Sequence, residues 1–270
     1  MEDRFRLMSK GRSISSKSSM VGDSDEKALF ICISILDIGR LGELIAKYPL
    51  EKQAQLTSVF DESGYTLIHA AAYYNSWRIL EMLLKIVYDA LKLMEQDAEM
   101  EIKKWVNMPT SSDEGFYPLH FSSFHGNPKL IELLVAAGAN INVKNKQGIN
   151  LLHVGAQGDQ AYSLTYFKNH INLNDTDDEK SSPLHWACFS GSDTAIYFLL
   201  AWAENVNSQD NMGYTPLHLA VRSAEHFPTT RSIKELLIKG ADKNLRDIGG
   251  KRPVDLAVEY QQGILREELV

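Results

Sequence analysis

The chain has 270 residues, 44% of them hydrophobic and 23% charged, which is enough for one large or two small globular domains. Its net charge of −7 argues against a dedicated nucleic-acid binder and favours a basic or apolar protein partner. Two cysteines, Cys32 and Cys188, are too few for a disulfide framework or a zinc cluster. They predict buried thiols in a reducing compartment.

Residues 1–24 are rich in serine and basic side chains, and we expect them to be a disordered tail. A solvated tail without a role is one interpretation; phosphorylation near Ser13 or weak contact with anionic lipid is the other. No apolar stretch of the kind found in signal peptides follows the basic residues. The longest apolar run, from 28 to 38, is well under the ~20 residues that span a bilayer. The sequence therefore predicts a cytoplasmic location, in the cytosol or the nucleus.

A four-residue motif recurs along the chain and marks the start of each predicted repeat. Five of the eight histidines occupy its last position. From His120 the histidines are 33, 32 and 33 residues apart, and a degenerate copy ends at Asp255, 37 residues further on. Self-similarity at such a period indicates a repeat architecture. The copies are Thr66–His69, Tyr117–His120, Asn150–His153, Ser182–His185, Thr215–His218 and Arg252–Asp255.

Each copy predicts a short helix followed by a second one. Thr, Ser or Asn at the first position can cap a helix, and Pro fits its first turn. Tyr117 and Arg252 are poor caps, so we expect those two helices to start less firmly. A glycine six residues after the histidine, as at Gly126 and Gly191, predicts the end of the first helix. Apolar stripes then predict the second helix, and Gly-Ala with polar residues predicts a tight turn.

These motifs resemble those of the ankyrin family, over about residues 26–262. The resemblance implies an all-α solenoid of about six helix-turn-helix units with β-turn or hairpin tips, and an ankyrin-repeat domain over 25–265. The expected units span about 26–60, 61–109, 110–144, 145–176, 177–209 and 210–265.

Two departures from the period predict insertions. His69 and His120 are 51 residues apart, about 18 more than one repeat needs. The extra residues are charged and helix-prone, and we expect an extended helix over about 85–105, either as one long helix or as a helical extension. Four extra residues around 225–228 predict a loop. Insertions in repeat proteins often lie on a functional face.

No catalytic motif, metal site or cofactor site is predicted. The sequence has no phosphate-binding glycine loop, no His-Glu-x-x-His and no Gly-x-Ser-x-Gly. A histidine repeated at every helix start is best explained as structural, bonded to backbone or to the motif hydroxyl. His185 and Cys188 give only two ligands, too few for a metal site. The carboxylates at 175–179 fit a solvated turn better than a catalytic pair.

A solenoid offers repeated positions for a partner, at its turn tips and along its first helices. In this chain these positions carry many aromatic side chains, the types enriched at binding hot spots. The alternative is that some of the rings pack between repeats; Trp186 fits either the groove or the core. The predicted groove comprises Tyr65, Tyr73, Tyr74, Phe116, Phe124, His125, Gln157, Phe189, Trp202, Met212, Tyr214 and Arg222.

The function predicted from these features is a non-catalytic adaptor or scaffold. It binds a peptide or loop of another protein, has no nucleic-acid partner and is monomeric. A second interpretation comes from residues 237–247 and 251–257, which are similar to the last repeats of ankyrin-bearing protein S-palmitoyltransferases. That resemblance implies a substrate-recruiting portion, held at a membrane by a missing C-terminal region or by a partner. Regulation of a phosphatase, kinase or transcription factor by occlusion is a third.

Overall fold

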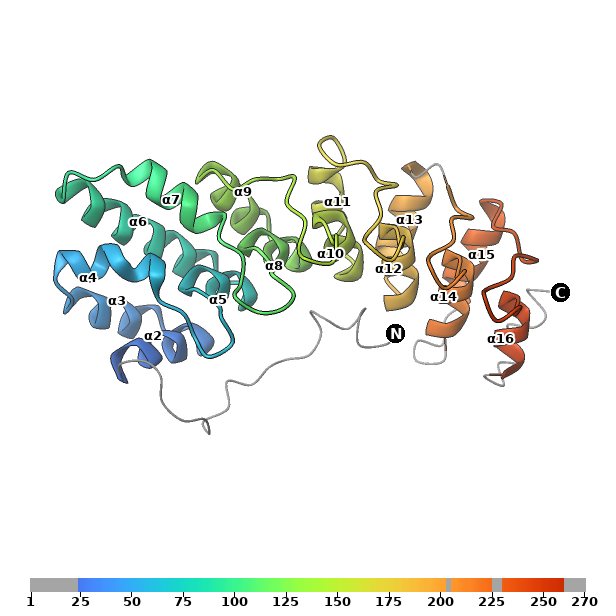
Figure 1. The fold of residues 1–270 in the computed structure, drawn as a ribbon, viewed down its shortest axis with the longest axis horizontal. Helices are drawn as coiled ribbons and strands as arrows, with labels where there is room; N and C mark the ends of the chain where they lie inside the picture. Colours follow the sequence, from blue (N-terminus) through green and yellow to red (C-terminus); the bar gives the residue numbers. More distant parts are fainter. Residues whose placement is uncertain (1–23, 203–204, 225–229, 260–270) are drawn as a thin grey trace. The chain divides into compact units, whose positions relative to one another are not determined.

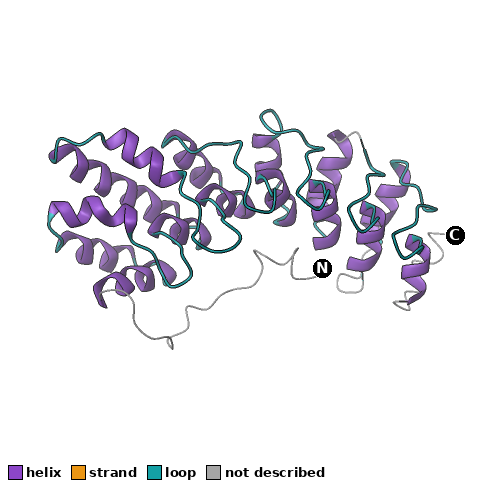
Figure 2. Cartoon of the chain, viewed as in Figure 1, coloured by secondary structure: helices purple, strands orange, loops and turns teal. Residues whose placement is uncertain are grey.

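The computed structural model describes residues 24–202, 205–224 and 230–259. The chain divides after Lys146 into two compact units, called here the N-terminal unit and the C-terminal unit. Within the described ranges both are helical, and the only β pairing is an isolated bridge between Phe60 and Thr66 (Figure 2). The all-α prediction is confirmed.

The N-terminal unit contains three stacked helix pairs, α2–α3, α5–α6 and α8–α9. Helices α4 and η1 are added after the first pair, and α7 is added after the second. The first helices of the pairs, α2, α5 and α8, pack on one another in an inner layer, and α6 packs on α9 in an outer layer (Figure 1). The helices are α2 Ser24–Ser34, α3 Ile38–Ala46, α4 Leu50–Ala54, the 3₁₀ helix η1 Gln55–Ser58, α5 Leu67–Tyr73, α6 Trp77–Leu93, α7 Ala98–Val106, α8 Pro118–His125 and α9 Pro128–Ala136.

The insertion between His69 and His120 forms two helices, so the expected continuous helix over 85–105 is wrong. Helix α6 is extended to Leu93, and the chain then turns through Glu95, which has a left-handed φ of 56°. Asp97 starts α7 because its carboxylate accepts a hydrogen bond from the Met100 amide at 3.0 Å. Buried Ile102 and Trp105 hold α7 to the unit. The insertion is therefore a hairpin of two helices, the end of α6 and all of α7.

The C-terminal unit repeats the pair more regularly. Helices α10, α12, α14 and α16 form the inner row, and α11, α13 and α15 form the outer row (Figure 1). The last predicted unit, 210–265, contains one pair and the first helix of another. The helices are α10 Leu151–Gln157, α11 Ala161–Phe167, α12 Pro183–Ser190, α13 Asp193–Trp202, α14 Pro216–Ser223, α15 Arg231–Ile238 and α16 Pro253–Glu259.

Four inner helices, α5, α8, α10 and α12, are followed by a left-handed residue six positions after the motif histidine. Gly126 and Gly191 adopt φ of 64° and 65°, as the sequence predicts. Asn75 and Asp159 adopt φ of 57° at the same register, which Asn and Asp tolerate better than other side chains do. The expected loop at 225–228 lies outside the described residues. So does the predicted tail, except for Ser24, where α2 begins.

Candidate functional site

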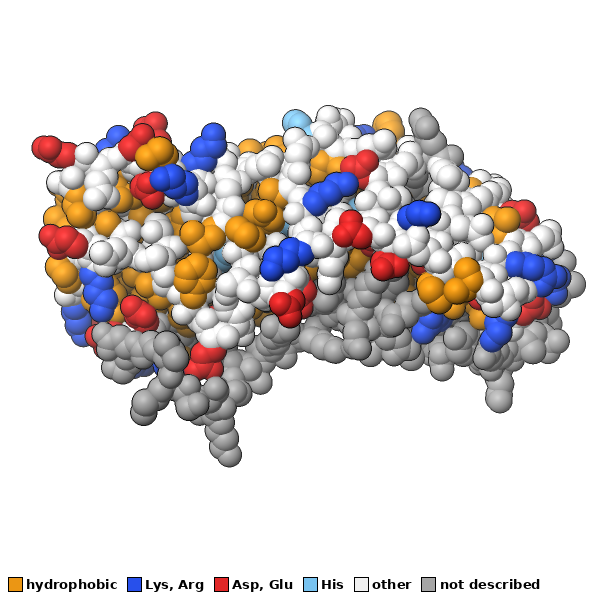
Figure 3. All heavy atoms as spheres, in the orientation of Figure 1, with side chains coloured by type: hydrophobic (Ala, Val, Ile, Leu, Met, Phe, Trp, Pro, Cys, Tyr) orange, Lys and Arg blue, Asp and Glu red, His pale blue; other side chains and the backbone are white. Residues whose placement is uncertain are grey.

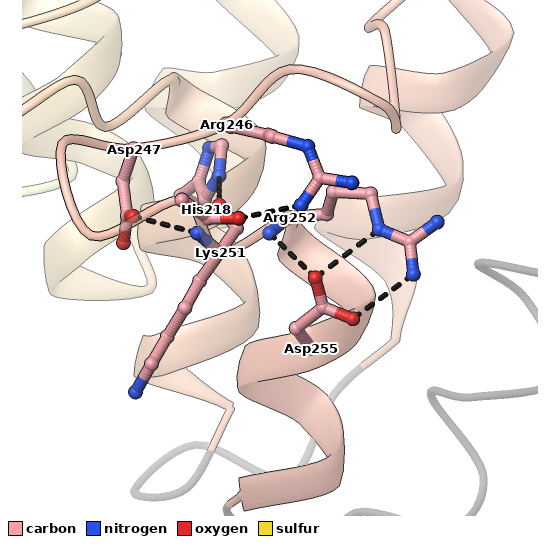
Figure 4. Close-up of polar contacts among 7 residues, drawn as sticks. His218, Arg246, Asp247, Lys251, Arg252 and Asp255 are labelled. Atoms are coloured by element: carbon pink, nitrogen blue, oxygen red, sulfur yellow. Dashed lines mark hydrogen bonds and ion pairs between the residues drawn. The ribbon is translucent and has the colours of Figure 1, made fainter.

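The motif histidines are fully buried and hold the starts of the inner helices. In the C-terminal unit, Nδ1 of His218 accepts hydrogen bonds from the amide of Thr215 at 3.2 Å and from its hydroxyl at 2.8 Å. Nε2 then donates to the Lys251 carbonyl at 3.1 Å, in the next repeat (Figure 4). His69 makes the same pair of contacts with Thr66 and Phe116. Each ring therefore caps its own helix and ties it to the following repeat.

Burial keeps these rings neutral. It lowers the pKa of His69 to about 3 and also lowers the pKa of His218. A neutral ring with both nitrogens bonded has no lone pair left for a metal or a proton transfer. The structural interpretation of the histidines is supported, and among the described residues no group of three His, Cys, Asp or Glu side chains could hold a metal ion.

The degenerate copy replaces the histidine with a carboxylate. Asp255 accepts a hydrogen bond from the Arg252 amide at 2.9 Å, so it caps the helix start as the histidine ring does (Figure 4). The Arg252 guanidinium also binds both carboxylate oxygens, at 3.1 and 3.0 Å. These bonds hold the pKa of Asp255 at about 2. The expectation that Arg252 is a poor cap therefore overlooked its partner three residues later.

Five of the six motif copies have an acidic or amide residue in the turn tip, eight positions before the motif's last residue. Asp177 is buried, and its Oδ1 accepts hydrogen bonds from the amides of Glu179 and Ser181 at 3.0 and 2.9 Å. Its Oδ2 accepts a bond from the indole of Trp186 at 2.9 Å, which places that ring in the core. Asp177 is thus a structural residue, not the solvated one expected. The recurrence of Asp61, Asn145, Asp177, Asp210 and Asp247 at one register was the available signal.

An aromatic surface lies at the ends of α5 and α8 in the N-terminal unit. Tyr65, Tyr73, Tyr74, Phe124 and His125, here called the aromatic surface, are all half-buried. The Tyr73 ring lies 5.1 Å from that of Tyr74 and 6.2 Å from that of Tyr65, centroid to centroid. Nε2 of His125 donates to the Tyr73 carbonyl at 2.7 Å, and burial lowers the pKa of this ring. The structure therefore brings these five predicted residues together.

Phe121, which sequence reasoning missed, packs against the aromatic surface from the buried side. It is buried, and its ring meets those of Tyr65 and Tyr73 edge-on, at 5.4 and 5.9 Å. Edge-to-face contacts of this kind fix ring orientation. Its position directly after a motif histidine, like that of Trp186, could have identified it as a core ring.

In the C-terminal unit, the predicted residues Phe189, Met212, Tyr214 and Arg222 are also half-buried. Phe189 is near the end of α12, and Arg222 near the end of α14. Met212 and Tyr214 lie in the turn before α14, where their amides both donate to Asp210 at 2.9 Å. These four residues form the C-terminal surface.

Three predicted groove residues need correction. Phe116 is 5% exposed, and its carbonyl and ring contact the core histidines His69 and His120. Gln157 is 8% exposed at the end of α10. Trp202 is 58% exposed, but it ends the outer helix α13, and Nζ of Lys168 lies 3.4 Å from its ring centroid. Register alone did not distinguish inter-repeat packing from exposure, or the outer layer from the inner one.

Comparison with known proteins agrees with this geometry. A family model described as ankyrin repeats in three copies matches residues 33–145 and 152–247. The chain is 27% identical over 232 residues to the chicken (Gallus gallus) nuclear factor NF-kappa-B p105 subunit, covering 84% of the chain and 22% of that protein. It is 28% identical over 193 residues to the Bos taurus ankyrin repeat and SOCS box protein 3, covering 71% and 34%.

A palmitoyltransferase is also similar. The chain is 26% identical over 139 residues to palmitoyltransferase AKR1 of Lachancea kluyveri, covering 50% of the chain and 18% of that protein. The chain thus spans about a third or less of the length of these relatives. No helix in the described ranges is long and apolar enough to cross a membrane.

Proposed function

Because the chain belongs to the ankyrin-repeat family, a generic protein-interaction module, we propose that it is a non-catalytic adaptor that binds a peptide or loop of a partner protein. The partner contacts the aromatic surface and the C-terminal surface. The chain acts as a monomer in the cytoplasm, and the buried free thiols of Cys32 and Cys188 support a reducing compartment.

The observation that carries the proposal is the aromatic surface itself. Its rings remain half-exposed although the neighbouring motif residues are buried, so solvent reaches them in the unbound chain. The bond from His125 to Tyr73 and the support from Phe121 hold the rings in place. A preorganised aromatic cluster loses little conformational entropy on binding, which makes it a favourable anchor.

The test is an affinity purification from cell extract with quantitative mass spectrometry. Phe124→Ala should lower recovery of the specific partner at least about fivefold, since truncating an aromatic anchor removes about 1–3 kcal/mol of binding free energy and 1.4 kcal/mol is tenfold in affinity. Phe189→Ala tests the C-terminal surface in the same way. Leu50→Ala is the matched control, because Leu50 is 40% exposed on α4, outside the predicted surface. Equal recovery with Phe124→Ala and Leu50→Ala would contradict the assignment.

The alternative function is the substrate-recruiting ankyrin portion of a protein S-palmitoyltransferase. It is supported by the similarity to palmitoyltransferase AKR1. Sequencing the natural transcript beyond the codon for Val270 tests it. Apolar spans and an Asp-His-His-Cys motif downstream would establish this function, and a stop codon would exclude it for this chain.

A further inference from the structure

The turns that precede α12, α14 and α16 lie side by side in the C-terminal unit. The Asn211 amide donates a hydrogen bond to the Glu179 carbonyl at 2.9 Å, and the Ile248 amide donates one to the Met212 carbonyl at 3.0 Å. These bonds join each turn to the next, so the three turns form one continuous row, called here the turn row. It consists of residues 173–182, 206–215 and 243–252, which occupy one register of the repeat.

The charge of the turn row changes sign along its length. The first turn carries four carboxylates and one lysine, a net charge of −3. The second carries one carboxylate, and the third carries four basic side chains and one carboxylate, a net charge of +3. Each turn contains one buried aspartate, Asp177, Asp210 or Asp247, so the difference lies in the other side chains. Figure 3 shows acidic side chains near α12, hydrophobic ones near α14 and basic ones towards α16.

The acidic end of the row faces solvent. Asp178 and Glu179 are exposed, as is Lys180, which offsets one of the carboxylates. The Glu179 carboxylate accepts a hydrogen bond from the side-chain amide of Asn211 at 3.2 Å. An amide carries no charge, so this bond orients the carboxylate without neutralising it. The first turn therefore presents a net negative charge to a partner.

The basic end faces solvent as well. Arg246 and Lys251 are exposed, and the Arg246 guanidinium donates to the Gly250 carbonyl at 2.6 Å. Arg252 is half-buried and forms an ion pair with Asp255, just after the turn. The net charge is still +2 when Asp255 is counted. The third turn therefore presents a net positive charge.

Apolar side chains lie in the second and third turns. Ile248 is 69% exposed, and Met212 and Tyr214, which belong to the C-terminal surface, are half-buried. The two turns are in close contact, because a Cβ atom added to Gly213 would lie 2.9 Å from the Cα of Asp247. Exposed apolar side chains bordered by charged ones are typical of an interaction surface.

We propose that the turn row binds an extended partner segment with an acidic end, an apolar centre and a basic end. The acidic end lies on the third turn, the apolar residues contact Met212, Tyr214 and Ile248, and the basic end lies on the first turn. This inference rests on the proposed function of the C-terminal surface. The reverse direction would bring like charges together, so the gradient fixes the orientation of the segment. An anionic membrane fits less well, because it would repel the first turn.

The length of the partner segment follows from the repeat spacing. Helices of adjacent repeats pack about 10 Å apart, so the row spans about 20 Å. An extended chain covers that distance with about six residues. A twelve-residue peptide is therefore long enough to contact all three turns.

The test is selection of a phage-displayed library of random twelve-residue peptides on the immobilised full chain. We expect enriched peptides to carry Asp or Glu at one end, apolar residues in the centre and Lys or Arg at the other end. Binding of a selected peptide, measured by fluorescence anisotropy, should weaken at least about tenfold in Arg246→Glu/Lys251→Glu and in Asp178→Lys/Glu179→Lys. Tyr214→Ala should weaken it at least about fivefold.

Two further variants separate a specific contact from a change of net charge or a loss of folding. Lys234→Glu/Lys239→Glu makes the same change of charge on the outer helix α15 and should alter binding less than twofold. Reversing both charged ends in one chain should restore binding to a peptide whose acidic and basic residues are exchanged. A failure of this rescue would mean that charge complementarity does not orient the segment, which would overturn the proposal.

The remaining outcomes distinguish this inference from the proposed function. Peptides that require Tyr214 but lack the charge pattern would overturn the inference and leave the proposed function intact. The absence of enriched peptides, or peptides that bind equally to Phe189→Ala and Tyr214→Ala, would contradict both. Sedimentation equilibrium of the chain alone tests a second copy as the occupant. A dimer that dissociates in Arg246→Glu/Lys251→Glu would assign the row to self-association and overturn the proposal.

Discussion

Helices α14 and α16 begin at the same position of the repeat, but a histidine caps the start of α14 and an aspartate caps the start of α16. His218 is fully buried, caps α14 and reaches the carbonyl of Lys251, in the turn that leads into α16. Asp255 caps α16 from a half-buried position and binds Arg252, three residues before it. The histidine therefore joins two repeats, whereas the hydrogen bonds of the aspartate to described residues stay within the start of its own helix. Equivalent caps can thus differ in whether they contribute to the stacking of repeats.

Of the changes considered, replacing His218 should lower the free energy of unfolding most. His218→Ala leaves the buried amide of Thr215 and the carbonyl of Lys251 without this partner, and each loss costs about 1–3 kcal/mol. We expect unfolding free energy to fall by about 2–4 kcal/mol, measured by urea denaturation followed by circular dichroism. Asp255→Ala should cause a much smaller loss. Equal losses would show that the bond between repeats contributes nothing.

The second-largest expected effect is that of pH: as the pH falls, the stability contributed by the buried histidines should be lost before that contributed by Asp255. Burial lowers the pKa of His69 to about 3, so the unfolded chain, with a histidine pKa of about 6.5, takes up the proton first. The contribution of a neutral buried histidine is present above pH 6.5 and is lost as pH falls towards 3, by about 1.4 kcal/mol per pH unit for each ring. The contribution of Asp255, whose pKa is about 2, is present above about pH 4 and is lost only as the pH approaches 2.

Urea denaturation between pH 7 and pH 4.5 measures this difference. His69→Gln should make the decline of stability with falling pH less steep. His170→Gln, at an exposed position, is the control. A slope that is identical in the wild type and in His69→Gln would rule out burial of a neutral ring as the cause.

The smallest effect should be local to α16. Asp255→Asn removes the ion pair with Arg252 but retains an oxygen that can accept the amide hydrogen bond. Hydrogen exchange of residues 253–259 should increase, while the urea midpoint of the whole chain stays within error. In 0.5 M NaCl the wild type should approach the variant, since salt screens exposed pairs. An exchange difference that persists in salt would mean that the charge is not responsible.

The candidate surface was only partly predictable from sequence. Repeat register placed Tyr65, Tyr73 and Phe124 on one predicted surface, because register fixes which end of a helix a residue occupies. It failed for Phe116, since a ring at the same register can turn into the core when the next repeat offers space. The motif histidine four residues later contacts the ring at all three equivalent positions, Tyr65, Phe116 and Tyr214, so neither the register nor this histidine decides which ring is buried.

The break between α6 and α7 also could not be predicted from the local sequence. Residues 85–105 contain no Pro or Gly, so helix propensity alone favours continuity. Burial of Ile102 and Trp105 against the unit requires the chain to fold back, and the left-handed Glu95 allows it. Packing of this kind outweighs local propensity, because burying an indole contributes more than a few residues of helical preference.

The amino-acid sequence by itself determined the repeat, its period, the helix pairs and the structural role of the histidines, because these depend on residues only a few positions apart. Tertiary structure alone decided which aromatic rings are exposed, where the insertion turns back, and that Asp177 is buried beneath Trp186. Those outcomes depend on the space that adjoining repeats leave for each side chain, and no local pattern specifies that space.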